Sequence, residues 1–149
     1  HKYENIRIGL NSRIDTIQAA ILIEKLKIFQ NELISREKVA NLYSKNLPEN
    51  IISPTVSKEI KSAWAQYTIT IHERDIIQTK LKENGIPSII YYPIPLSRQA
   101  GYEKYPEVSS GLHVTNLLSE SVLSLPMHPY LKKDEIVNIC SKLSDLTLK

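Results

Sequence analysis

The chain has 149 residues, of which 42% are hydrophobic and 23% are charged, and its net charge is +3. These values are typical of one soluble globular domain and argue against a disordered or fibrous protein. Lysine and glutamate alternate along the sequence and Lys132–Lys133 is the one basic pair, so the pattern is not that of a nucleic-acid-binding protein.

Residues 9–22 place a polar loop directly before an apolar helical pattern. Asp15 and Gln18 have the spacing of a capping box, which predicts that a helix begins directly after Asp15. Asn11 and Arg13 precede this helix, and amide and guanidinium groups are suited to bind phosphate or carboxylate oxygens. The same residues are also ordinary in a turn, with Arg13 in solvent. Local chemistry therefore leaves an anion-binding loop and a simple turn both open.

Two helical patterns follow the loop, over about 16–29 and 35–46. They belong either to one long helix or to two packed helices, because few residues between them would break a helix. Pro48 ends the run. The first pattern carries an apolar stripe at helical spacing, formed by Ile17, Ala20, Ile21 and Leu26.

The rest of the sequence predicts a small mixed fold. Alternating apolar and polar residues indicate a strand at 64–71, and two short runs rich in aliphatic and aromatic residues indicate further strands at 88–92 and 121–125. Helices are expected between and after them, over about 75–84, over about 112–118, and from about 133 onward. The predicted fold class is therefore α/β, a small open sheet with flanking helices.

Tyr91 and Tyr92 end the second predicted strand. Adjacent strand residues point to opposite faces, so one ring should pack inward while the other presents its hydroxyl at the end of the sheet. Ligand sites are common at that position in open α/β sheets. Tyrosine is also an ordinary strand residue, so this pair alone does not define a site.

Other candidate chemistry is sparse. The four histidines have no metal-ligand spacing, which predicts no metal site. The single cysteine, Cys140, lies on the apolar side of the last predicted helix, which excludes a disulfide framework and predicts a buried thiol. No triad, carboxylate pair or activated lysine stands out, so the sequence predicts no catalytic residue.

The sequence also bears on location. No apolar run reaches the roughly 18 residues needed to span a bilayer, and no signal peptide opens the chain, which favours a cytoplasmic protein. The chain starts at His1 with no recognisable beginning of a fold. We therefore expect a piece of a longer polypeptide, although a processed chain would look the same.

Three segments together resemble one family, the DegT/DnrJ/EryC1/StrS aminotransferases. They are Gly9-Leu10-Asn11-Ser12-Arg13-Ile14-Asp15 with the helix that follows, Gly85-Ile86-Pro87 leading to Tyr92-Pro93-Ile94-Pro95-Leu96, and Leu123-Ser124-Leu125-Pro126-Met127-His128-Pro129. The resemblance covers nearly the whole chain. It is nearest to enzymes that aminate the 3-keto position of a UDP-linked N-acetylated hexuronic acid.

This resemblance implies a fold and an activity. Residues 1–149 would be the C-terminal small-domain portion of the aspartate-aminotransferase fold, the type I fold of pyridoxal-phosphate transferases, with an interface loop and long helix over 9–46. The enzyme would transfer an amino group, commonly from glutamate, to a keto-sugar nucleotide in bacterial surface-polysaccharide biosynthesis. It would work as a homodimer, with active sites at the subunit interface and no nucleic-acid or membrane partner.

The resemblance also implies roles for single residues. Asn11 would reach the cofactor phosphate of the neighbouring subunit, and Arg13 would face the anionic sugar nucleotide. Tyr91 and Tyr92 match positions that line the sugar site. Tyr92 is the usual residue there, whereas Tyr91 and Ser97 stand where relatives have histidine, so the identity of the sugar is not fixed.

The lysine that forms the Schiff base with pyridoxal phosphate would lie upstream of His1. The chain alone is therefore expected to be inactive. A second hypothesis stays open, namely a non-catalytic module derived from this fold that serves in association or ligand sensing. A coding sequence upstream of His1 with a lysine of the family type would favour the enzyme.

Overall fold

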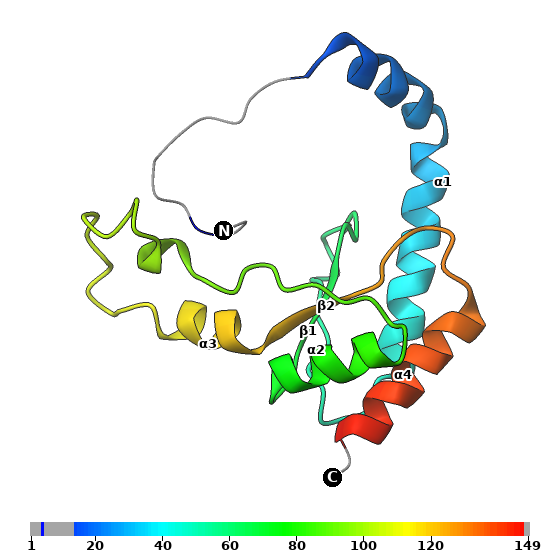
Figure 1. The fold of residues 1–149 in the computed structure, drawn as a ribbon. Coiled ribbons are helices and arrows are strands. Elements are labelled where there is room, and N and C mark those ends of the chain that lie inside the picture. Colours follow the sequence, from blue (N-terminus) through cyan, green and yellow to red (C-terminus); the bar gives the residue numbers. More distant parts are fainter. Residues whose placement is uncertain (1–3, 5–13, 148–149) are drawn as a thin grey trace.

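The computed structural model describes residue 4 and residues 14–147, which form four α-helices, one 3-10 turn and a two-stranded sheet (Figure 1). Asn11 and Arg13 lie outside the described residues. In chain order the elements are α1 (Thr16–Asn46), β1 (Tyr67–Thr70), α2 (Arg74–Glu83), η1 (Leu96–Arg98), α3 (His113–Ser121), β2 (Val122–Leu125) and α4 (Lys133–Thr147). The predicted helices and the α/β class are confirmed.

Helix α1 is continuous over 31 residues, so the alternative of two packed helices is wrong. The predicted capping box is confirmed: the Gln18 backbone N–H donates to Asp15 Oδ1 at 2.9 Å, and the Asp15 N–H donates to Gln18 Oε1 at 3.3 Å. Only the C-terminal half of α1 packs on the body of the domain, and the N-terminal half projects from it (Figure 1).

The sheet pairs β1 with β2 in antiparallel register, with Tyr67 opposite Leu125 and Thr70 opposite Val122. The predicted third strand at 88–92 is wrong, because only Ile89 pairs, through an isolated bridge to Ser124. Pro87 and Pro93 on either side of this segment have no backbone N–H, which leaves little room for a ladder.

Strand β1 is also shorter than the predicted 64–71. Trp64 has a φ of +44°, a conformation that a strand cannot contain. The residue is held in place from α1: Arg36 Nη1 donates to the Trp64 carbonyl at 2.9 Å, and Trp64 Nε1 donates to Glu37 Oε2 at 2.6 Å. The chain therefore turns at Trp64 before it enters the sheet.

The core lies between the sheet, the C-terminal half of α1, and helices α2 and α4. Helix α4 packs on both α1 and α2, and α2 contacts β2. The largest fully buried side chains are Tyr43, Tyr67, Ile69, Leu81, Leu123, Ile136 and Leu143. Tyr43 and Tyr67 stack with their ring centroids 4.8 Å apart. Cys140 is buried in this core, as predicted, and burial raises the pKa of its thiol to about 11.

Candidate functional site

The loop before α1 carries two of the four predicted site residues, Asn11 and Arg13. Since both lie outside the described residues, their roles remain predictions. What the structure does fix is the start of the helix that follows them, through the Asp15 and Gln18 cap. A capped helix start of this kind leaves backbone N–H groups near the end of the preceding loop.

A pocket of about 280 Å³ lies where three separate segments of the chain meet. Its lining residues in the described part of the chain are Ala65, Gln66, Pro87, Ser88, Ile89, Tyr91, Ser124, Leu125, Pro126 and Met127. The second and third motifs of the sequence are thereby brought together. None of these ten side chains is charged, so the described residues offer no phosphate-binding set at this point.

Tyr91 and Tyr92 lie in the connection between α2 and α3, just after the Ile89 bridge. Their rings do not point to opposite faces as predicted: they contact each other edge to face, with centroids 5.6 Å apart. The reason is that the segment is a bend and not a strand, so the alternation of a pleated strand does not apply. Tyr91 is half-buried and lines the pocket, whereas Tyr92 is 63% exposed.

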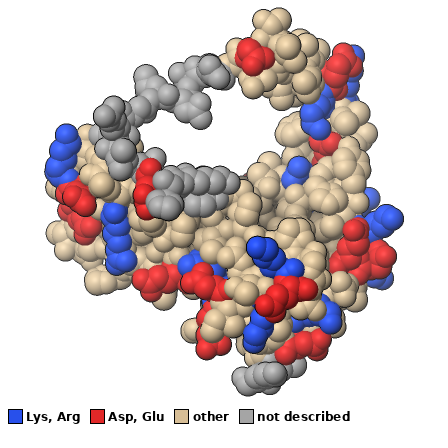
Figure 2. All heavy atoms as spheres, in the orientation of Figure 1, with Lys and Arg blue, Asp and Glu red and all other residues tan. Residues whose placement is uncertain are grey.

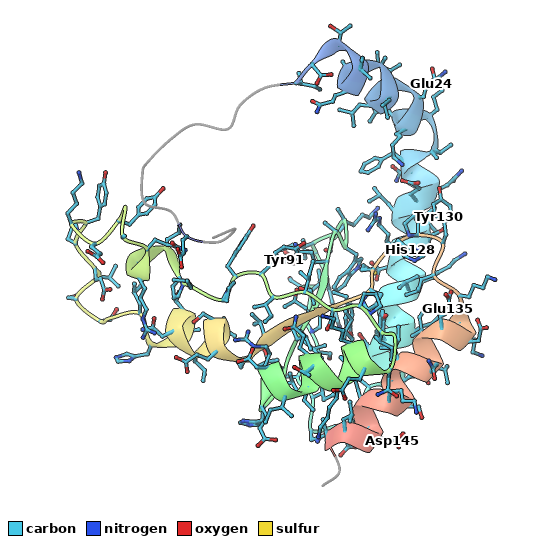
Figure 3. The ribbon with its side chains drawn as sticks, in the orientation of Figure 1. Glu24, Tyr91, His128, Tyr130, Glu135 and Asp145 are labelled. Atoms are coloured by element: carbon cyan, nitrogen blue, oxygen red, sulfur yellow. The ribbon has the colours of Figure 1, made fainter. Side chains whose placement is uncertain are left out.

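The connection from β2 to α4 carries the third motif and is fixed to α1 by two tyrosine hydroxyls. Tyr43 Oη donates to the carbonyl of Pro126 at 2.9 Å, and Tyr130 Oη donates to Glu32 Oε1 at 2.7 Å. Between them, His128 Nδ1 accepts from the Tyr130 N–H at 3.3 Å in a turn (Figure 3). Pro126, a wall residue of the pocket, is therefore fixed from the core side.

Two features of this region were not predicted from the sequence. Glu32 is buried within α1, 8% exposed, although lysine and glutamate recur through residues 24–38 as they do on a solvated helix. The Ser88 hydroxyl is buried and has no hydrogen-bond partner among the described residues. No local pattern signals either feature, because each depends on residues that are distant in sequence.

On the face that Figure 2 presents, the charged side chains of the described residues do not single out an anion site. Figure 2 shows acidic and basic side chains intermixed over α2 and α4 on the face that it presents. No group of three or more histidine, cysteine or acidic side chains in the described range is placed to hold a metal ion. Within the same range, no helix has the length and hydropathy needed to cross a bilayer.

The chain is similar in sequence to two aminotransferases. The sequence is 41% identical over 145 residues to the UDP-2-acetamido-2-deoxy-3-oxo-D-glucuronate aminotransferase of Pseudomonas aeruginosa, covering 97% of this chain and 40% of that protein. It is 32% identical over 140 residues to the UDP-N-acetyl-3-dehydro-alpha-D-glucosamine 3-aminotransferase of Acidithiobacillus ferrooxidans, covering 93% of this chain and 37% of that protein.

The fold matches solved structures closely. A DegT/DnrJ/EryC1/StrS aminotransferase from Brucella abortus superposes with a TM-score of 0.87 at 42% identity, over 99% of this chain and 39% of that one. The chain thus spans about two fifths of the length of the relatives it matches. The sequence profile of the family itself matches residues 1–144. From profile, identity and fold together, the chain belongs to the DegT/DnrJ/EryC1/StrS aminotransferase family.

Proposed function

We propose that this chain is the C-terminal part of a pyridoxal-phosphate-dependent aminotransferase, and that the whole protein transfers an amino group from glutamate to the keto group of a UDP-linked 2-acetamido sugar. The observation that carries the proposal is the 41% identity over 97% of the chain to the Pseudomonas aeruginosa enzyme, whose name specifies such a substrate. The Acidithiobacillus ferrooxidans relative is likewise named for an N-acetylated UDP-sugar.

The cofactor would supply the chemistry of amino-group transfer, because pyridoxal phosphate acts as an electron sink. The uncharged pocket beside Tyr91 does not fit its phosphate. We assign that contact instead to Asn11, whose amide can donate to a phosphate oxygen. Arg13 would pair with the anionic sugar nucleotide, since its planar guanidinium matches phosphate and carboxylate oxygens.

Tyr91 and Tyr92 are proposed to contact the sugar. Two observations support this assignment: Tyr91 forms part of the wall of the pocket, and Tyr92 beside it is 63% exposed. We further propose a homodimer in which the loop before α1 contributes to the neighbouring subunit's site. The exposed apolar side chains on the projecting half of α1 are consistent with a surface that packs against more protein.

The chain by itself is proposed to be inactive, because the lysine that tethers the cofactor would belong to the remaining three fifths of the relatives' length. Adding pyridoxal phosphate to the 149-residue chain should then give no specific absorbance band. A specific band that survives replacement of the exposed lysines would contradict this part of the proposal.

The test of the function uses the complete coding region that contains these residues. The purified product is incubated with isotopically labelled glutamate and a UDP-linked 2-acetamido-3-keto sugar, and mass spectrometry follows the label. Transfer of the label to the sugar supports the proposal. A coding region without an upstream lysine-bearing domain, or no transfer to any UDP-linked or dTDP-linked keto-sugar, would favour a non-catalytic module instead.

A further inference from the structure

The pocket beside Tyr91 lies at the end of the sheet where the chain enters β1 and leaves β2. Its wall includes Ala65 and Gln66, which lead into β1, and Pro126 and Met127, which follow β2. Because the two strands are antiparallel, these two pairs of residues lie at the same end of the sheet. The separation of the two segments therefore determines the width of the pocket.

Helix α1 holds both of these segments through hydrogen bonds. On the β2 side, Tyr43 Oη donates to the Pro126 carbonyl at 2.9 Å. On the β1 side, the contacts are made to Trp64, the residue directly before the pocket wall. Arg36 Nη1 donates to the Trp64 carbonyl at 2.9 Å, and Glu37 Oε2 accepts from Trp64 Nε1 at 2.6 Å. One helix thus fixes both sides of the pocket.

The backbone at Trp64 depends on this support. Its φ of +44° is in the left-handed region, which is unfavourable for a bulky side chain. Besides the two contacts from α1, the Trp64 N–H donates to Ser62 Oγ at 3.1 Å. A strained conformation of this kind persists only where the surrounding structure holds it. Without Arg36 or Glu37 the chain at Trp64 would relax, and the two wall residues that follow it would shift.

We propose that Arg36 and Glu37 are positioning residues for the binding of the sugar. They hold Trp64 so that the pocket has the width that the sugar requires. Neither side chain is among the described residues that line the pocket, so both act through Trp64 and not by contact with the ligand. A wall that is in place before the sugar arrives need not be ordered on binding, which favours affinity. The inference rests on the proposed function, in which the sugar lies against Tyr91.

The experiment measures the steady-state kinetics of the complete enzyme with the UDP-linked 2-acetamido-3-keto sugar. Arg36→Ala and Glu37→Ala should each raise KM for the sugar about 3- to 10-fold, because apparent affinity falls with the fraction of molecules whose wall is correctly placed. Saturating sugar restores that fraction, so kcat should stay within about twofold. The affinity for pyridoxal phosphate should not change.

The two substitutions remove charges of opposite sign, which separates positioning from electrostatics. A direct effect of charge on the anionic sugar nucleotide would move KM in opposite directions in the two variants. Positioning through Trp64 moves KM in the same direction in both. Glu37→Gln keeps an acceptor oxygen for the indole N–H and should retain the KM of the unsubstituted enzyme.

Asn50→Ala is the matched control. It too removes a side-chain N–H that donates to a distant backbone carbonyl, that of Thr147 at 3.2 Å, and neither residue lines the pocket. It should leave KM unchanged.

Three results would overturn the proposal: opposite changes of KM in Arg36→Ala and Glu37→Ala, an unchanged KM in both, or an equal rise in Asn50→Ala. Glu37 is exposed, so Glu37→Ala still provides the test if Arg36→Ala does not fold. Failure of the unsubstituted enzyme to aminate the sugar contradicts the proposed function itself, and is seen before any variant is made.

Discussion

The hydroxyl of Tyr130 donates a 2.7 Å hydrogen bond to the Oε1 atom of Glu32, across 98 residues of sequence. Glu32 is buried in the middle of α1, and its Oε1 also lies 3.7 Å from Lys25 Nζ. A buried carboxylate requires such partners, because an unpaired charge in the interior is strongly unfavourable. This hydrogen bond holds the connection from β2 to α4, which carries the third motif, against α1.

Tyr130→Phe should therefore destabilise this domain while leaving its fold intact. The substitution removes the hydrogen bond from Tyr130 to the buried Glu32 carboxylate and leaves the contact with Lys25. Urea unfolding of the 149-residue chain, followed by the fluorescence of Trp64, its single tryptophan, should show a lower midpoint with an unchanged slope. Tyr105→Phe, at an exposed tyrosine, is the control. Equal midpoints for the two variants would show that the hydrogen bond contributes nothing.

Alkaline pH should lower the stability of the fold, because it deprotonates a buried thiol and buried tyrosine hydroxyls. Burial raises the pKa of the Cys140 thiol from 9.0 to about 11, and burial also raises the pKa of Tyr43 and Tyr67. Because the folded pKa is the higher one, the unfolded chain loses these protons first. The stability that Cys140 contributes is present below pH 9 and is lost as the pH rises to about 11. Chemical unfolding of Cys140→Ala across this range should show a shallower decline, and an unchanged decline would contradict the assignment.

The Asp15 cap should stabilise the start of α1 by a measurable amount. Replacing an N-cap aspartate by alanine costs about 1 kcal/mol, whereas asparagine retains the acceptor oxygen. In Asp15→Ala, hydrogen exchange at the Gln18 amide, which donates to Asp15 Oδ1, should be about fivefold faster than in Asp15→Asn. The same exchange rate in both variants would mean that the cap does not limit fraying.

The isolated chain should self-associate through the projecting half of α1. Ile17, Ile21 and Leu26 are 75%, 56% and 67% exposed, an apolar stripe with nothing described against it. Sedimentation should show oligomers that Ile17→Glu with Leu26→Glu dissolves, while Gln30→Glu on the same helix leaves them. A monomeric unsubstituted chain with little dye-accessible apolar surface would count against an interface here.

The roles proposed for Arg13 and Asn11 predict that replacing each one in the complete enzyme affects a different property. Arg13→Ala removes a charged partner of the sugar nucleotide and should raise KM about tenfold or more, with cofactor affinity little changed. Asn11→Ala should chiefly weaken pyridoxal phosphate binding, measured by absorbance titration. Equal loss of both properties in Arg13→Ala would show that its role is misassigned.

Local signals account for the parts of the fold that could be predicted. The Asp15 and Gln18 spacing marks the start of α1, the alternation around Tyr67 marks β1, and the short apolar run around Leu123 marks β2. The predicted strand at 88–92 was wrong because its aliphatic and aromatic residues favour a strand, whereas Pro87 and Pro93 on either side prevent a ladder. The contacts that define the site could not be predicted, since Glu32 meets Tyr130 and Ser124 meets Ile89 only after the chain has folded.

The continuity of α1 has a consequence for how this domain can change in evolution. Each residue of an α-helix turns the chain by about 100° and advances it by about 1.5 Å. Inserting or deleting one residue between the Asp15 cap and the buried Val39 would therefore swing the entry of the chain around the helix axis, while the core stayed in place. The number of residues between the Asp15 cap and Val39 therefore determines the direction from which the chain enters α1, relative to the core.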